Sequence, residues 1–145
     1  MTFPDTKFAS AAEYAQSYFE QIAAAAKTVD GQAVQRAADI LTEVYRNGGM
    51  LYSCGNGGSA AIANHLVCDH CKLVRTDTEL QSRIYSLSSN VEIITAIGND
   101  LSYDEIFVYQ LSSLAKPGDA LNTISSSGNS ENIVRAVQWA KANGI

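Results

Sequence analysis

The sequence is poor in charged residues, in proline and in cysteine. Of 145 residues, 17% are charged, 2 are proline and 3 are cysteine. A soluble globular domain usually carries about a quarter charged residues. The low share, with many alanines among the apolar residues, indicates helices that pack closely, including against other subunits. The length suits one domain with one core.

Clustered basic residues are also missing. The 10 lysines and arginines are scattered along the chain, and the formal net charge is -5. Because nucleic acid binding requires a basic face that displaces counterions, we exclude nucleic acid as a partner. A small anion needs only a local positive pocket, so it remains a candidate ligand.

The sequence has no secretory leader and no long apolar run. Residues 1–5 contain neither a charged nor an apolar leader segment, and the longest apolar run is too short to cross a bilayer. The three cysteines, Cys54, Cys68 and Cys71, are an odd number, which is typical of reduced thiols. We therefore expect a cytoplasmic protein without a membrane partner.

Apolar periodicity and turn residues predict alternating helices and strands. Helices are expected at 9–27, 32–46, 59–72, 91–97, 104–114 and 130–142, and strands at 50–54, 83–88 and 120–124. The polar stretch 74–82 is interpreted as a surface loop. Strands that alternate with helices indicate an α/β fold with an open parallel sheet.

The expected organisation is a single domain over residues 1–145. Two N-terminal helices, at about 9–47, precede the sheet part at about 49–145. Near the end, Asn143 and Gly144 are typical of a helix C-cap, and Ile145 would begin a fourth strand. Because a three-stranded parallel sheet would leave an exposed edge, we expect the natural protein to continue beyond this point.

The segment 124–132 is predicted to be a phosphate cradle. It follows a strand, precedes a helix and contains one glycine, Gly128, and four serines: Ser125, Ser126, Ser127 and Ser130. A helix N-terminus offers unpaired N–H groups to an anion, and ligands of open parallel sheets bind at the carboxyl ends of the strands. The alternative is that the serines only cap the helix, but one serine would suffice for that.

The glycine-rich loop Gly55–Ser59 follows the first predicted strand in the same way. Neither loop has the Gly-Lys-Ser/Thr ending of a nucleotide P-loop, and the glycines of Gly55–Ser59 do not match the dinucleotide pattern. We therefore expect no nucleotide cofactor, and two serine-bearing loops suit a phosphorylated polyol.

Three motifs in one order resemble the SIS (sugar isomerase) domain family: 54–59, 98–100 and 124–130. Within it, the chain looks closest to the phosphoheptose isomerases, which convert D-sedoheptulose 7-phosphate to D-glycero-D-manno-heptose 7-phosphate through an enediol. The resemblance implies a flavodoxin-like sheet with helices on both faces, and a homotetramer with shared active sites.

The resemblance also implies roles for individual residues. Four positions match the phosphate site of the family: Ser125, Ser126, Ser127 and Ser130. Four positions match its sugar-facing loop: Asn56, Gly57, Gly58 and Ser59. Asp100 matches an aspartate near the substrate hydroxyls.

The catalytic base of the family is a glutamate one helical turn after a histidine. Here that pair aligns with His65 and Asp69, whose spacing puts both on one helix face. Aspartate is one methylene shorter, and a misplacement on the order of 1 Å can cost about a hundredfold in rate. The acid of the family, a C-terminal histidine, would lie beyond Ile145.

The resemblance further implies zinc, because some family members bind it with this histidine, this carboxylate and two C-terminal residues. The metal ligands would then be His65 and Asp69. A second possible set adds Cys68, His70 and Cys71, while the alternative is that the two cysteines are packed thiols.

Two functions remain open from the sequence. The first is an isomerase of heptose 7-phosphate in lipopolysaccharide precursor synthesis. The second is a non-catalytic SIS domain that senses a phosphosugar or acts as an initiator-associating interaction protein. Two features favour it: the shorter carboxylate of Asp69, and Cys68 at a position where the family often has an acidic residue.

Overall fold

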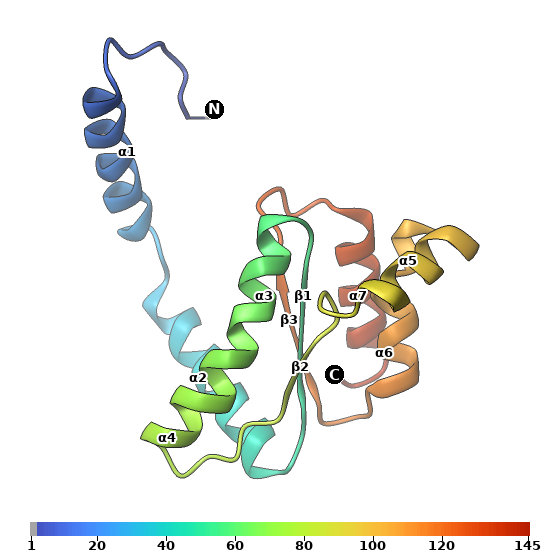
Figure 1. Cartoon of the computed structure of the whole chain (residues 1–145). Helices are drawn as coiled ribbons and strands as arrows, with labels where there is room; N and C mark the ends of the chain where they lie inside the picture. The colour runs from blue at the N-terminus through green and yellow to red at the C-terminus, as the bar shows by residue number, and fades with distance from the viewer. Residues whose placement is uncertain (1–2) are drawn as a thin grey trace. The chain divides into compact units, whose positions relative to one another are not determined.

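The structure is a computed structural model that describes residues 3–145 (Figure 1). Its contacts divide the chain into two compact units, one ending at Ala37 and the other spanning Ala38–Ile145. Within the described residues, no helix is both long and apolar enough to cross a bilayer.

The first unit contains helix α1, Ala11–Ala26, and the beginning of α2, Gly31–Arg46. The Ser10 hydroxyl caps α1 by accepting a hydrogen bond from the backbone N–H of Glu13, at 3.1 Å. Helix α1 buries none of its residues. Both helices were predicted to within two residues at each end.

The sheet lies in the second unit and consists of β1 (Leu51–Gly55), β2 (Ile84–Ser86) and β3 (Ala120–Ile124). The strand order is β2-β1-β3, and both pairs are parallel. The predicted parallel sheet is therefore confirmed, and β3 has its predicted bounds. All three carboxyl ends lie at one edge of the sheet.

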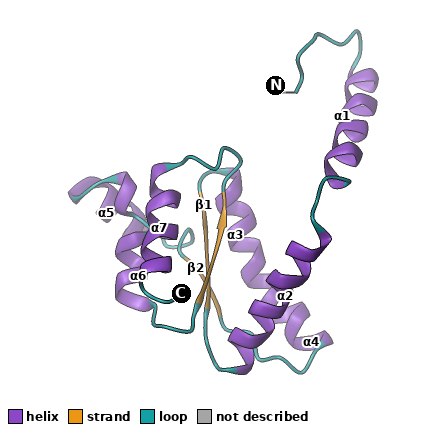
Figure 2. Ribbon diagram, turned by 180° about the vertical axis from the view of Figure 1, so that it is seen from behind, coloured by secondary structure: helices purple, strands orange, loops and turns teal. Residues whose placement is uncertain are grey.

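Helices lie on both sides of the sheet (Figures 1 and 2). Alternate residues of the central strand pack against different helices. Tyr52 and Cys54 belong to the main core, which includes residues of α5 (Val91–Asp100), α6 (Val108–Leu114) and α7 (Glu131–Ala142). Leu51 packs with the end of α2, and the Ser53 hydroxyl donates to the Ala63 carbonyl of α3 (Gly58–Cys68). Helices cover both faces of the sheet, as predicted.

The helix after β1 runs further than its sequence predicted. Helix α3 continues as a π-helical stretch, Asp69–Val74, and ends in a short turn, α4, Arg75–Asp77. The loop prediction for 74–82 is therefore wrong in its first part. Exposed helical turns need no apolar stripe, and here the hydroxyl of Thr76 bonds back to the Lys72 carbonyl.

Two other helices differ from their predicted bounds. Helix α5 continues through Gly98 to Asp100, so this glycine does not end the helix. The helix predicted at 104–114 is a 3-10 turn, η2, Tyr103–Glu105, followed by α6. The Ser102 hydroxyl caps the start of η2 by accepting a hydrogen bond from the Asp104 N–H, so this turn begins separately from α5.

Candidate functional site

Two loops meet at the carboxyl edge of the sheet and enclose a small pocket. The strands that lead into them are hydrogen-bonded neighbours, with Gly55 paired in register with Ile124. The pocket has a volume of about 70 Å³ and is lined by Asn56, Ser59, Ile124, Ser125, Ser126 and Ser130. The structure thus brings the predicted glycine loop and the predicted phosphate cradle together.

The glycine loop depends on a close approach at Gly55. A Cβ atom on Gly55 would lie 2.6 Å from the carbonyl carbon and oxygen of Ser59, which is closer than real Cβ contacts. Gly57 has a φ of 54°, a value that side-chain-bearing residues rarely adopt. Together these glycines let the chain turn sharply from β1 into α3 and place Ser59 at the pocket.

The serines of the second loop have different structural roles. The hydroxyls of Ser125 and Ser127 accept the backbone N–H groups of Gly128 and Asn129, at 3.1 and 3.2 Å, so they shape the turn. Ser130 stands at the N-cap of α7, but its side chain makes no capping bond and lines the pocket. The capping-only interpretation therefore does not describe Ser130, while Ser127 lies outside the pocket lining.

Two further residues complete the site and were missed from sequence. The side-chain amides of Asn56 and Asn132 exchange two hydrogen bonds, of 2.9 and 3.0 Å. The Tyr103 hydroxyl donates a third, of 2.9 Å, to Asn56 Oδ1. A signal for Asn132 existed, because it lies on the same helical stripe as the buried Ala136 and Ala140 and is itself 2% exposed.

The end of β2 is tied to the same edge by serine hydroxyls. Ser88 donates through its hydroxyl to the Gly55 carbonyl, at 2.8 Å, and accepts from the Gly55 N–H, at 3.1 Å. Ser86 donates to Asn64 Oδ1 of α3, at 2.6 Å. These bonds hold the first residue of the glycine loop from both its N–H and its carbonyl.

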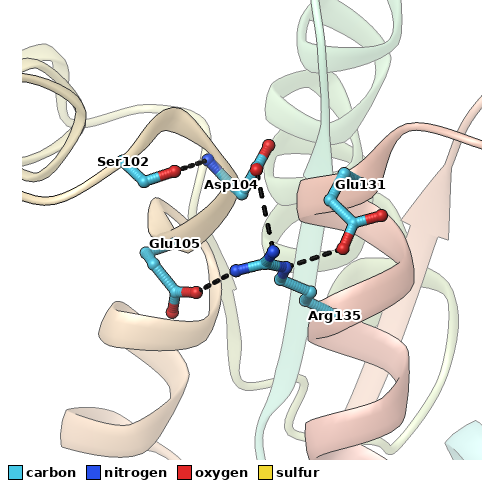
Figure 3. Close-up of polar contacts among 5 residues, drawn as sticks. All are labelled: Ser102, Asp104, Glu105, Glu131 and Arg135. Carbon is cyan, nitrogen blue, oxygen red and sulfur yellow. Dashed lines mark hydrogen bonds and ion pairs between the residues drawn. The ribbon is translucent and has the colours of Figure 1, made fainter.

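An ion-pair cluster joins η2 to α7 (Figure 3). Arg135 reaches Glu131 at 2.7 Å, Glu105 at 2.5 Å and Asp104 at 3.8 Å. Hydrogen bonds to Glu131 and then Glu105 raise the pKa of Arg135 above its usual value. The cluster fixes the turn that carries Tyr103 against the helix that carries Asn132.

His65 and Asp69 lie side by side on the helix, as their spacing predicts. His65 Nε2 and Asp69 Oδ1 are 3.4 Å apart, and their side chains are 72% and 39% exposed. Neither residue lines the pocket described above. Asp69 follows Ser59 along the same helical segment, and the helical rise per residue places the two about 15 Å apart.

The described residues of this chain do not complete a zinc site. Among residues 3–145, no three histidine, cysteine, aspartate or glutamate side chains gather as a metal site would require, and zinc binds three or four protein ligands. Cys68 and Cys71 are exposed free thiols, so the packed-thiol interpretation of these two residues is wrong. His70 instead bonds to the Tyr45 hydroxyl at 2.6 Å.

The remaining predicted residues lie outside the pocket lining. Asp100 is the last residue of α5, is exposed, and accepts a hydrogen bond of 2.8 Å from the Asn99 side chain. Gly57 and Gly58 form the turn and the first residue of α3. The structure thus gathers Asn56, Ser59 and three of the four serines into one pocket, and leaves Asp100 outside it.

Comparison with known proteins agrees with this fold and this arrangement of loops. The sequence profile of the SIS domain matches residues 13–145. The chain therefore belongs to the SIS domain family.

Several relatives carry a more specific name. The chain is 42% identical over 109 residues to the phosphoheptose isomerase of Helicobacter hepaticus, a match that covers 75% of this chain and 55% of the relative. It is 39% identical over 114 residues to the phosphoheptose isomerase of Rhodospirillum rubrum, covering 78% and 60%. The chain thus spans little more than half the length of these relatives.

Solved structures show the same fold. Phosphoheptose isomerase GmhA from Neisseria gonorrhoeae superposes with a TM-score of 0.82 at 31% identity, over 93% of this chain and 71% of that one. A phosphoheptose isomerase from Francisella tularensis gives 0.78 at 33% identity, with the same coverage. The α/β fold predicted from the sequence is confirmed.

Proposed function

We propose that the protein is a phosphosugar isomerase that converts D-sedoheptulose 7-phosphate to D-glycero-D-manno-heptose 7-phosphate in the cytoplasm. One observation carries the proposal: two hydroxyl-bearing loops and the N-terminus of α7 converge on one pocket at the carboxyl edge of a parallel sheet. The names of the relatives support the reaction.

The phosphate group of the substrate would occupy this pocket. Ser126, Ser130 and Ser59 line it with hydroxyls, and Asn56 adds a side-chain amide. The α7 N-terminus contributes the positive end of its dipole. The phosphate is thus bound by neutral donors, which agrees with an acidic chain that has no basic block.

The isomerisation moves a proton between two adjacent carbons through an enediol, so it needs a base and an acid. We propose Asp69 as the base, oriented by His65 at 3.4 Å. Because Asp69 and Ser59 are separated along one helix by about 15 Å, we propose that the active site is completed by a neighbouring subunit of a homotetramer.

Zinc, if it is bound, would be held by the same two residues, His65 and Asp69. His65 and Asp69 offer two donor atoms, a nitrogen and an oxygen, both suited to zinc. Further ligands would come from outside the described residues. Bound there, the ion would polarise a substrate oxygen, and no step above depends on it.

A second candidate function is phosphosugar binding without turnover. The observation that favours it is the shorter carboxylate at Asp69, because a reach deficit on the order of 1 Å can lower a rate about a hundredfold. The pocket would be equally suited to a sensor, since it binds the phosphate and does not touch the reacting carbons.

The test is turnover of sedoheptulose 7-phosphate by the purified protein, followed by coupled detection of heptose 7-phosphate. We expect Asp69→Asn to lower kcat by about a hundredfold or more with little change in KM, because only proton transfer is lost. The double variant Ser126→Ala/Ser130→Ala should raise KM by about tenfold or more, since two phosphate bonds are lost.

Asp77→Asn is the matched control for the carboxylate, because Asp77 is exposed on α4 of the same helical segment. It should leave both constants unchanged. Absence of turnover in the presence of added divalent metal, together with measurable sugar-phosphate binding, would reject the isomerase and support the sensor.

A further inference from the structure

The two walls of the phosphate pocket are joined by a pair of side-chain amides. Asn56 follows β1, and Asn132 lies in the first turn of α7, 76 residues later. Each amide donates to the oxygen of the other, at 2.9 and 3.0 Å. Asn56 lines the pocket, whereas Asn132 lies behind it and is 2% exposed.

We propose that Asn132 is a positioning residue for the anion pocket, which acts through Asn56 and is assisted by Tyr103. The proposal rests on the proposed function only in taking the pocket as the phosphate site. Asn132 itself does not line the pocket, so its effect on a ligand must pass through the residue it holds.

The pattern of donors and acceptors determines what Asn56 presents to a ligand. Its Oδ1 accepts from Asn132 Nδ2 and from the Tyr103 hydroxyl, at 3.0 and 2.9 Å. An amide oxygen has two lone pairs, so both are used. Its Nδ2 has two hydrogens and gives one to Asn132. The remaining hydrogen makes Asn56 a donor toward the pocket, which suits an acceptor such as a phosphate oxygen.

Burial makes this pairing strongly preferred. Asn132 is almost fully buried on α7, and a buried amide without partners is costly. Because α7 starts at Glu131, directly after Ser130, the pair also fixes the distance between the serine loop and the glycine loop. Asn132 therefore sets both the orientation of one ligand donor and the spacing of the two loops.

Tyr103 adds a third element to the same amide. Its side chain is 56% exposed, so burial does not hold it in place. Its turn is held instead by Arg135 of α7, which forms ion pairs with Glu105 and Asp104, the two residues that follow Tyr103 (Figure 3). The hydroxyl of Tyr103 is thus presented to Asn56 from a turn that is fixed to α7.

The alternative is that Asn132 only stabilises the fold. The two roles differ in a double-mutant cycle with inorganic phosphate as the probe, measured by calorimetry on the wild type, Asn132→Ala, Asn56→Ala and the double variant. If Asn132 acts through Asn56, Asn132→Ala should weaken phosphate binding by about tenfold, and it should have no further effect once Asn56 is alanine. Thermal unfolding of each variant is recorded in parallel.

Tyr103→Phe keeps the test decisive even if Asn132→Ala does not fold, because it removes one exposed hydroxyl. We expect phosphate binding about threefold weaker with an unchanged melting temperature. Tyr109→Phe is the matched control, since Tyr109 is similarly exposed, on α6, and lies outside the pocket lining. It should leave phosphate affinity unchanged.

Independent effects of Asn132→Ala and Asn56→Ala, a loss of stability without a loss of affinity, or equal behaviour of Tyr103→Phe and Tyr109→Phe would each overturn the proposal. So would failure of the wild type to bind phosphate. Turnover of sedoheptulose 7-phosphate is measured separately. Coupling of Asn132 and Asn56 in phosphate binding without turnover would reject the isomerase and retain Asn132 as a positioning residue. Turnover without this coupling would retain the isomerase and reject the role of Asn132.

Discussion

At the scale of single residues, burial separates the three cysteines. Cys54 is fully buried beside Tyr52 in the main core, and this burial raises its thiol pKa to about 12. Cys68 and Cys71 are exposed on the helical segment that follows the glycine loop. Because the thiolate is the reactive form, the three thiols should differ in reactivity.

We expect two thiols per chain to react with Ellman's reagent at pH 8 in the native protein. Cys54 remains protonated far above this pH and is shielded by the core. All three thiols should react in guanidinium chloride, which serves as the control. Reaction of three thiols in the native protein, at one common rate, would contradict the burial of Cys54.

The same scale shows how far single residues could be interpreted from sequence. The serine loop was predicted as a unit because four hydroxyls in six positions exceed what a helix cap needs. Only the structure assigned Ser127 to the turn and Ser130 to the pocket. A hydroxyl can donate to a ligand or accept from a nearby N–H, and the choice depends on loop geometry that composition does not encode.

At the scale of elements, the junction between β1 and α3 depends on the absence of a side chain at Gly55. We expect Gly55→Ala to destabilise the protein by about 1–3 kcal/mol, because the added methyl would overlap the backbone of Ser59. Phosphate affinity should fall with it, since Ser59 lines the pocket. Urea unfolding and phosphate calorimetry measure the two effects.

Gly58→Ala is the matched control for this substitution. Gly58 has an ordinary backbone conformation, and a Cβ there would meet no atom within 4 Å. Its stability should therefore change by less than about 0.5 kcal/mol. Equal destabilisation by the two alanines would show that loss of glycine flexibility, and not the close approach to Ser59, decides the outcome.

Elements with a strong local pattern were predicted well, and those without one were not. The third strand has its predicted bounds, because an apolar run lies between a Pro-Gly turn and a serine loop. The extension of α3 through Val74 to Asp77 was missed. Exposed polar turns show no periodicity, so nothing in the sequence separates them from a loop.

At the scale of the whole molecule, the exposed apolar residues of α1 call for an explanation. Tyr14, Tyr18, Phe19 and Ile22 are 40%, 44%, 63% and 49% exposed, on a helix that buries no residue. An isolated helix of this length is only marginally stable in water. Contacts with other copies of the chain, as in the proposed homotetramer, would stabilise it.

We expect the protein to have the mass of a tetramer in light scattering and the double variant Phe19→Glu/Ile22→Glu to dissociate to smaller species. Two carboxylates buried in an apolar contact would cost more than the contact contributes. Gln21→Glu adds a charge to the same helix at an exposed polar position and should leave the tetramer intact. A monomeric wild type would remove the oligomer from the proposed function.

The sequence by itself determined the α/β class, the order of the strands along the chain and the two loops that bind phosphate in our proposal. These depend on apolar periodicity and on turn residues, which act over a few neighbouring positions. The tertiary structure alone decided which residues share the pocket. Asn56 and Asn132 are 76 positions apart and meet only because β1 and β3 pair in parallel, with Gly55 beside Ile124. Such a contact depends on strand register and helix packing, which no short segment of the sequence specifies.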